Sequence, residues 1–75
     1  MPKITLEAAR VNTKLTQAEL ARKMDVSRET VVAWENGKRE MRAAYLHMFC
    51  SITGFNVGDI ILPEVSTLSV PEEEK

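Results

Sequence analysis

Apolar residues recur at helical spacing on both sides of Thr16, and they frame the start of a helix. The Thr16 hydroxyl can accept a hydrogen bond from the backbone N–H of Glu19, while the Glu19 carboxylate can reach back to the N–H of Thr16. This reciprocal pair is a capping box. Leu15 before the cap and Leu20 after it occupy the positions of a hydrophobic staple. The pattern therefore predicts a helix that begins directly after Thr16.

A second helix start follows at Ser27, with Val26 before it and Val31 in the staple position. The helix is expected to span Arg28–Asn36, because Gly37 offers the left-handed conformation in which helices commonly end. Two helices joined by a short polar turn are typical of a helix-turn-helix, whose second helix enters the major groove of DNA.

The second helix of this pair has two different faces, since successive residues are rotated by about 100°. Val31 and Trp34 share the face that is expected to join the core. Their expected contacts on the first helix are Leu20, Ala21 and Met24. Arginine can bond guanine, glutamate can accept from cytosine, and valine or alanine can touch a thymine methyl. The opposite face is therefore predicted to read bases, through Arg28, Glu29, Val32 and Ala33.

Three further helices complete the predicted fold. The first covers residues 6–12 after the cap Thr5, another covers residues 42–53 and ends at Gly54, and a short one covers residues 57–62. The fold class is thus expected to be all-α, a compact five-helix bundle. In the first helix, the apolar contacts are expected from Leu6, Ala9 and Val11.

The motif as a whole resembles the helix-turn-helix of the phage-repressor and Cro family, the XRE family, of small bacterial and phage DNA-binding proteins. The resemblance spans residues 6 to about 62. The matching residues in the first motif helix are Gln17, Glu19, Leu20 and Ala21, and those that follow are Val26, Ser27, Val31, Glu35, Asn36, Gly37, Lys38 and Arg39. The resemblance implies a lambda-repressor-like fold. It also implies a dimeric transcriptional repressor that binds a two-fold symmetric double-stranded DNA operator.

The resemblance also implies a role for each matching residue. Gln17 and Ser27 would bind phosphates at helix N-termini, where free N–H groups favour anions. Neighbouring phosphates, which position the protein without specifying sequence, would be held by Asn36, Lys38 and Arg39. Bases would be read by Arg28, Glu29 and Ala33. An ion pair between Arg10 and Glu35 would link the first and third helices.

The chain departs from the family pattern at four loop positions. Lys14 and Asp25 stand where the family usually has glycine, and Met41 and Arg42 replace the usual proline and capping residue. These departures concern loop geometry and the start of the fourth helix, and none removes a DNA contact.

Charge divides the chain into two parts. The net charge of −1 conceals nine Lys or Arg against seven Asp or Glu in residues 1–62, and four Glu against one Lys in residues 63–75. We therefore expect a DNA-binding domain over residues 1–62, followed by an acidic tail. The basic groups near the expected DNA face are Arg28, Lys38, Arg39 and Arg42.

A domain of this size is marginally stable alone and is helped by oligomerisation.

Other features of the composition limit the function classes. The sequence contains neither a long apolar run nor a signal-peptide pattern, and its single cysteine, Cys50, cannot form an internal disulfide, so a cytoplasmic protein without membrane contact is expected. It also lacks a catalytic triad, a metal-ligand cluster and a phosphate-binding glycine loop. We expect no enzyme activity, cofactor or metal.

The predicted fourth helix carries more apolar residues than one buried face requires. One stripe is Leu46, Phe49, Cys50 and Thr53, and a second is Met41, Tyr45, Met48 and Ile52. The second stripe can pack on the fifth helix and the tail, or it can form a dimer surface with Ile60, Ile61 and Leu62. It also allows an alternative function, in which an antitoxin-like or adaptor protein binds another protein. The alternating segment Val65 to Val70 can be disordered, lie over the fourth helix or pair across a dimer.

Overall fold

The first motif helix begins at its expected cap. The computed structural model describes residues 3–64, in which α2 (Gln17–Met24) follows Thr16. The Oγ1 atom of Thr16 accepts from the N–H of Glu19 at 3.0 Å, and the Glu19 carboxylate accepts from the N–H of Thr16 at 2.8 Å. The capping box is therefore confirmed, and it fixes where α2 starts.

The second motif helix also has the predicted bounds. α3 (Arg28–Asn36) follows Ser27, whose Oγ accepts from the N–H of Thr30 at 3.2 Å, and it ends at Gly37 with φ of 76°. In the turn between α2 and α3, Asp25 takes the left-handed conformation with φ of 59°. The chain thus keeps a left-handed turn residue without a glycine there.

α1 (Leu6–Asn12) begins as expected, because Thr5 Oγ1 accepts from the N–H of Ala8 at 3.1 Å. The prediction that Val11 belongs to the core is wrong, since 56% of this residue is exposed. Leu6 and Ala9 are buried as predicted, whereas Val11 lies on the solvent side of α1.

The fourth helix starts later than the sequence suggested. α4 (Ala43–Thr53) has Arg42 at its cap position, where no side-chain hydrogen bond forms. Met41 therefore precedes the helix, and it is buried in the core. Its assignment to a second, partner-binding stripe is wrong. α4 ends at Gly54 in the left-handed conformation, as predicted.

The predicted fifth helix is also wrong. One 3-10 turn, η1 (Val57–Asp59), leads into β2 (Ile60–Ile61), which pairs in parallel with β1 (Ile4–Thr5). Ile4 lies opposite Ile60. Gly and β-branched residues disfavour a helix at residues 57–61, and the strand buries the Ile60 side chain while pairing its backbone. Within residues 3–64 the fold is therefore four helices with a two-stranded sheet, in place of the predicted five-helix bundle.

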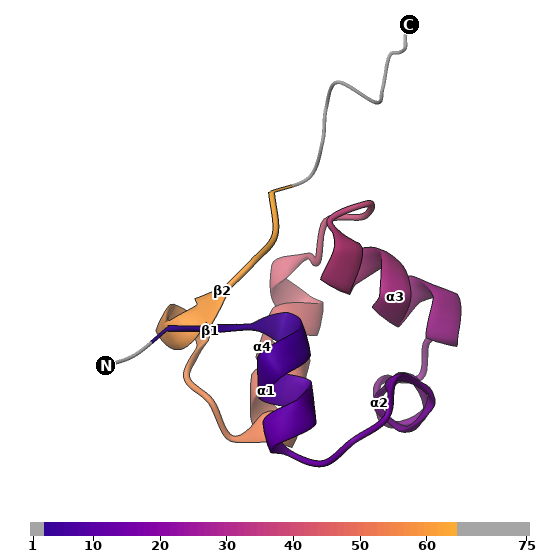
Figure 1. Ribbon diagram of the computed structural model, residues 1–75, viewed down its shortest axis with the longest axis horizontal. Coiled ribbons are helices and arrows are strands. Elements are labelled where there is room, and N and C mark those ends of the chain that lie inside the picture. Colours follow the sequence, from indigo (N-terminus) through magenta and orange to yellow (C-terminus); the bar gives the residue numbers. More distant parts are fainter. Residues whose placement is uncertain (1–2, 65–75) are drawn as a thin grey trace, which may run out of the picture.

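This strand pair joins segments that are far apart in the sequence, and Figure 1 shows β1 and β2 side by side next to α1. All four helices lie in the connection between the two strands. The Lys3 ammonium adds a hydrogen bond to the carbonyl of Gly58 at 3.1 Å. The strand pair thus ties the start of the described chain to a segment near its end.

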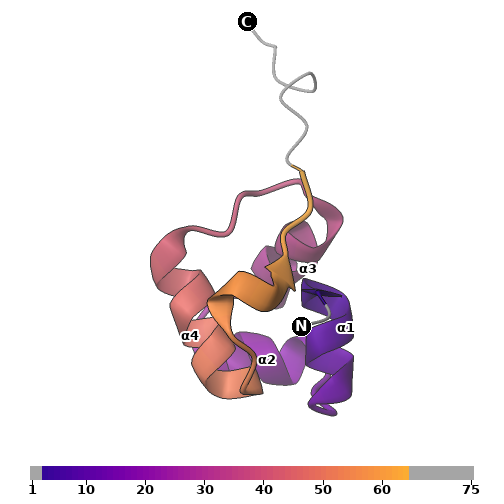
Figure 2. The ribbon, with the colours of Figure 1, turned by 90° about the vertical axis from the view of Figure 1, so that its left-hand side faces the viewer.

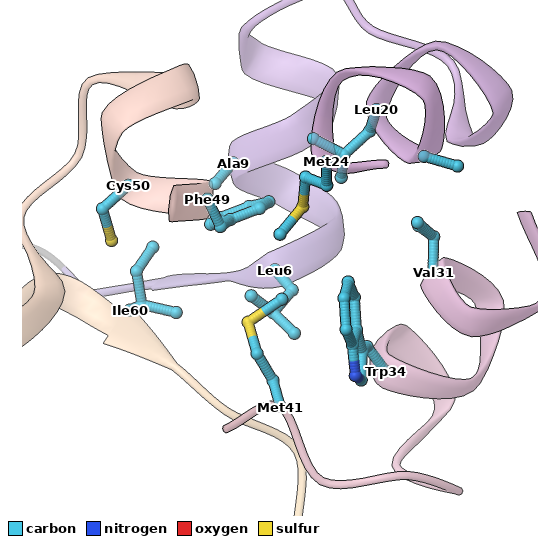
Figure 3. Close-up of a cluster of buried hydrophobic side chains, with 11 residues drawn as sticks. Leu6, Ala9, Leu20, Met24, Val31, Trp34, Met41, Phe49, Cys50 and Ile60 are labelled. Carbon is cyan, nitrogen blue, oxygen red and sulfur yellow. The ribbon is translucent and has the colours of Figure 1, made fainter. Parts of the chain in front are cut away.

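One apolar core lies between these elements. Figure 3 shows its side chains converging from all four helices, from β2 and from the loop before α4. The buried apolar residues are Leu6, Ala9, Leu20, Ala21, Met24, Val31, Trp34, Met41, Phe49, Cys50 and Ile60. Burial raises the pKa of the Cys50 thiol. Val31 and Trp34 belong to this core, so the predicted buried face of α3 is confirmed.

The capping box makes stability depend on pH. The hydrogen bond from the Thr16 backbone N–H, supported by the Thr16 hydroxyl, lowers the pKa of Glu19 from its ordinary value of 4.5. The folded state then binds fewer protons than the unfolded state, so this contribution is complete above pH 4.5 and is lost as pH falls through the lowered pKa. We expect the difference in unfolding free energy between wild type and Glu19→Gln to be constant at neutral pH and to change below pH 4.5.

Urea titrations across this pH range measure that difference. Glutamine can also complete a capping box, so Glu19→Gln removes the titration and retains the cap. Glu7→Gln is the control for the loss of an exposed carboxylate in the first turn of a helix. A difference between wild type and Glu19→Gln that is independent of pH would contradict the assignment.

Candidate nucleic-acid interface

α3 packs on α2 through its apolar face, and this contact orients the rest of the helix. Val31 and Trp34 are buried in the same cluster as Leu20, Ala21 and Met24. The connecting turn is tight, with the Val26 N–H donating to the Ala21 carbonyl at 3.0 Å. As Figure 1 shows, α3 lies at the edge of the molecule, away from the strand pair. Its second face is therefore turned outward.

The four residues predicted to read bases lie on that outward side of α3. Arg28 and Glu29 are exposed, while Val32 and Ala33 are half-buried. Asn36, near the end of the helix, is exposed as well. An exposed arginine and carboxylate beside two small apolar side chains give the helix both hydrogen-bonding and methyl-binding groups. Their contact with bases stays a prediction.

The structure contains the Arg10–Glu35 ion pair that the resemblance implies. Arg10 Nε lies 2.7 Å from Glu35 Oε2, and the two side chains are only 10% and 5% exposed. Arg10 also donates through Nη1 to the carbonyl of Leu15 at 2.8 Å. The pair joins α1 to α3, and it is shielded from solvent on the inner side of α3.

Gln17 connects this buried pair to Arg28. Its Nε2 donates to Glu35 Oε1 at 3.0 Å, while its Oε1 accepts from Arg28 Nη2 at 3.3 Å. Sequence reasoning assigned Gln17 to phosphate alone and missed this bridge. The position of Gln17 as the first residue of α2 gave no signal for it, because the contacts depend on how α2 and α3 cross. The bridge braces the Arg28 guanidinium from inside the fold.

Hydroxyl and guanidinium groups gather on the other flank of α3. Ser27 Oγ and Thr30 Oγ1 are 2.9 Å apart, and Arg39 Nη1 donates to Thr30 Oγ1 at 3.3 Å. They border an open groove of about 540 Å³, which we call the α3–α4 groove. Its lining residues are Val26, Ser27, Thr30, Trp34, Arg39, Glu40, Arg42 and Tyr45. Thr30 and Arg42 were not among the predicted contact residues.

The positive charges around α3 are available to an anion. Within residues 3–64 the Arg10–Glu35 contact is the only ion pair. Arg28, Lys38, Arg39 and Arg42 are exposed, and each has no carboxylate within ion-pair distance in this part of the chain. Cations therefore lie on both sides of α3. This arrangement allows contacts to the phosphates on both sides of a DNA groove.

Comparison with known proteins identifies the family. The sequence profile of the helix-turn-helix family matches residues 6–55. The chain belongs to this helix-turn-helix family, of the XRE type. Helix-turn-helix domains of this type are DNA-binding modules of transcription regulators. The match includes α1 to α4 and excludes both strands of the sheet. No match was found among curated proteins or among solved structures.

Residues 3–64 contain neither a membrane-spanning helix nor a group of potential metal ligands. No helix in this range has the length and apolar character needed to cross a membrane. No three His, Cys, Asp or Glu side chains in the range gather into a group that could hold a metal ion.

Proposed function

We propose that the protein is a sequence-specific transcriptional repressor that binds double-stranded DNA as a homodimer and inserts α3 into the major groove. The main support for this proposal is that Arg28, on the exposed side of α3, is held in place by a hydrogen bond within the fold. Arg28 is held by Gln17, which is itself held by the buried Glu35 carboxylate. A guanidinium restrained in this way loses less freedom when it binds guanine in two-point fashion.

Base recognition in this proposal uses the exposed face of α3. Arg28 bonds guanine O6 and N7, and Glu29 accepts from the N4 amine of cytosine. Val32 and Ala33 contact thymine methyl groups, which suits their half-buried positions.

Phosphate binding uses the two ends of the motif. At the N-termini of α2 and α3, the contacts come from Gln17 and Ser27, because the first N–H groups of a helix favour anions. After the C-terminus of α3, they come from Asn36, Lys38 and Arg39. Arg42, exposed at the cap of α4, extends this set. These contacts fix the register of α3 in the groove without specifying sequence.

The test is selection of bound sequences from a random duplex pool. Wild type is expected to enrich two half-sites about 34–36 Å apart, the spacing of a dimer on one face of DNA. Arg28→Ala is expected to lose about 5- to 150-fold discrimination at one base pair of each half-site, the range for one bidentate pair. Arg22→Ala, which removes an exposed arginine from α2, is the matched control and should enrich the wild-type sequence.

Two outcomes would count against sequence reading. One is equal enrichment of all sequences by wild type. The other is a uniform loss of affinity in Arg28→Ala with no change in base preference, since this is the behaviour of a phosphate contact.

A second candidate function is that of an antitoxin-like or adaptor protein whose main partner is another protein. The surface available for it is smaller than the sequence suggested. Tyr45 and Met48 are 37% and 41% exposed on α4, whereas Ile52 packs on the core. Ile61 and Leu62 are exposed after the strand, but Ile60 is buried. Co-purification of a stoichiometric partner that is lost in Tyr45→Ala/Met48→Ala would favour this function.

A further inference from the structure

The chain leaves the described structure beside the proposed DNA-binding face. Pro63 and Glu64 lie against Gly37, since a Cβ atom built on Gly37 would be 3.0 Å from the Glu64 carbonyl oxygen and 3.3 Å from Pro63 Cβ. Leu62 and Pro63 also share a small cavity with Arg39. Figures 1 and 2 both show the segment after β2 running beside the loop that follows α3. The described chain therefore ends at Glu64 beside Gly37, the residue that precedes Lys38 and Arg39.

The sequence beyond Glu64 carries a run of negative charge, opposite in sign to the arginines of the α3–α4 groove. Glu72, Glu73 and Glu74 are consecutive, and the five residues before Pro71 contain no charged group. In the α3–α4 groove, the guanidiniums of Arg39 and Arg42 stand against one lining carboxylate, Glu40, which forms no ion pair among residues 3–64. The acidic run and the groove are thus complementary in charge.

The distances allow the acidic run to reach the groove. Glu72 follows Glu64 by eight residues, which can span at most about 26–29 Å and span about 15 Å on average as a flexible chain. α3 has nine residues, which rise about 13.5 Å along the helix. A segment attached beside the C-terminal end of α3 can therefore reach the whole helix and the groove on its flank.

We propose that Glu72–Glu74 bind in the α3–α4 groove, on Arg39 and Arg42, and compete there with DNA phosphate. Carboxylates and phosphates are alternative bidentate partners of a guanidinium. Because the acidic run is on the same chain, its effective concentration at the groove is of millimolar order. The consequence is autoinhibition: DNA that offers phosphates alone is held weakly, whereas DNA that also engages α3 through its bases displaces the run.

This inference rests on the proposed DNA binding, but its structural part can be tested without DNA. Nuclear magnetic resonance spectra of the full chain are compared with those of Glu72→Gln/Glu73→Gln/Glu74→Gln. The side-chain Nε–H signals of Arg39 and Arg42 are expected to shift between the two proteins at low salt and to coincide at about 1 M salt, where charges are screened within about 3 Å. The Arg22 signal, on α2, is the internal control and should not move.

Two spectral results would overturn the proposal. Identical Arg39 and Arg42 signals in both proteins at low salt would show that the acidic run does not occupy the groove. Shifts confined to Tyr45 and Met48 would place the segment on the exposed side of α4 instead. Neither result depends on whether the protein binds DNA, so failure of the proposed function is recognised separately.

The competition itself is measured with random-sequence duplex DNA. The triple glutamine variant is expected to bind about 3- to 10-fold tighter than wild type at low salt, the range expected of a few exposed ion pairs. This difference should shrink as salt is added. Glu7→Gln, an exposed carboxylate on α1, is the control for general repulsion. If Glu7→Gln increases DNA affinity as much per carboxylate removed as the triple variant does, the proposed contact in the groove is contradicted.

Discussion

Arg10→Ala is expected to lower the free energy of unfolding by about 3–5 kcal/mol, the usual effect of breaking a buried ion pair. The variant would leave the Glu35 carboxylate, whose side chain is 5% exposed, with only Gln17 as a side-chain partner in the described structure. Domains of this length have a total stability of roughly 4–11 kcal/mol. Urea denaturation followed by circular dichroism should therefore show a midpoint far below that of wild type.

The double variant Arg10→Met/Glu35→Leu separates the cost of an unpaired charge from the value of the pair. Apolar residues of similar size often replace a buried ion pair with little loss. We expect the double variant to recover most of the stability that Arg10→Ala loses, although Gln17 loses its acceptor. A double variant as unstable as the single one would show that the pair itself, and not its isolation, determines stability.

Trp34→Ala is expected to cost about 3–5 kcal/mol, which is typical of removing a large aromatic side chain from a core. Trp34 is 3% exposed, and Figure 3 shows it inside the cluster that joins α3 to Leu6 and Met41. Its ring also lies 5.1 Å from the Tyr45 ring, tilted by 47°. Because Trp34 is the single tryptophan of the chain, thermal unfolding is followed by circular dichroism instead of fluorescence.

Tyr45→Ala provides the matched control for this prediction. It removes the same aromatic contact from the exposed side, and such a pair contributes about 0.5–1.5 kcal/mol beyond its area. Trp34→Phe should fall between the two, since it retains an aromatic ring but fills less volume. Equal losses in Trp34→Ala and Tyr45→Ala would mean that the aromatic pair outweighs the packing of Trp34 in the core.

The helix boundaries of the motif were predictable because their determinants are local. Thr16 and Ser27 each bond a backbone N–H three residues away, and Gly37 supplies a single backbone conformation. None of these interactions depends on how the helices pack. The division of α3 into a buried and an exposed face was also predictable, since it follows from helical periodicity alone.

The strand pair could not be predicted in the same way. Ile4 and Ile60 are 56 positions apart, and a two-residue strand is too short to show alternation. Met41 was misplaced because its spacing fits a helix that in fact begins at Ala43. Each error arose where a tertiary contact decides between local alternatives.

The site was predicted in outline, and the connections within it were not. The outward face of α3 followed from the sequence. The bridge from Glu35 through Gln17 to Arg28 joins residues 18 and 11 positions apart, and the Arg39–Thr30 bond spans nine. Such contacts depend on the angle between elements, which residue spacing alone does not determine. They are also what turns a row of polar side chains into a positioned site.

The parallel strand pair has a consequence for the order in which the domain folds. β1 is made before the four helices of the described residues, and its partner Ile60–Ile61 is made after them. At about 5–20 residues per second, a ribosome needs roughly 3–11 s to add the 56 residues between them. During that time Ile4 has no strand beside it, and the core lacks Ile60. The synthesis of β2 therefore determines when the edge of β1 is withdrawn from pairing with other chains.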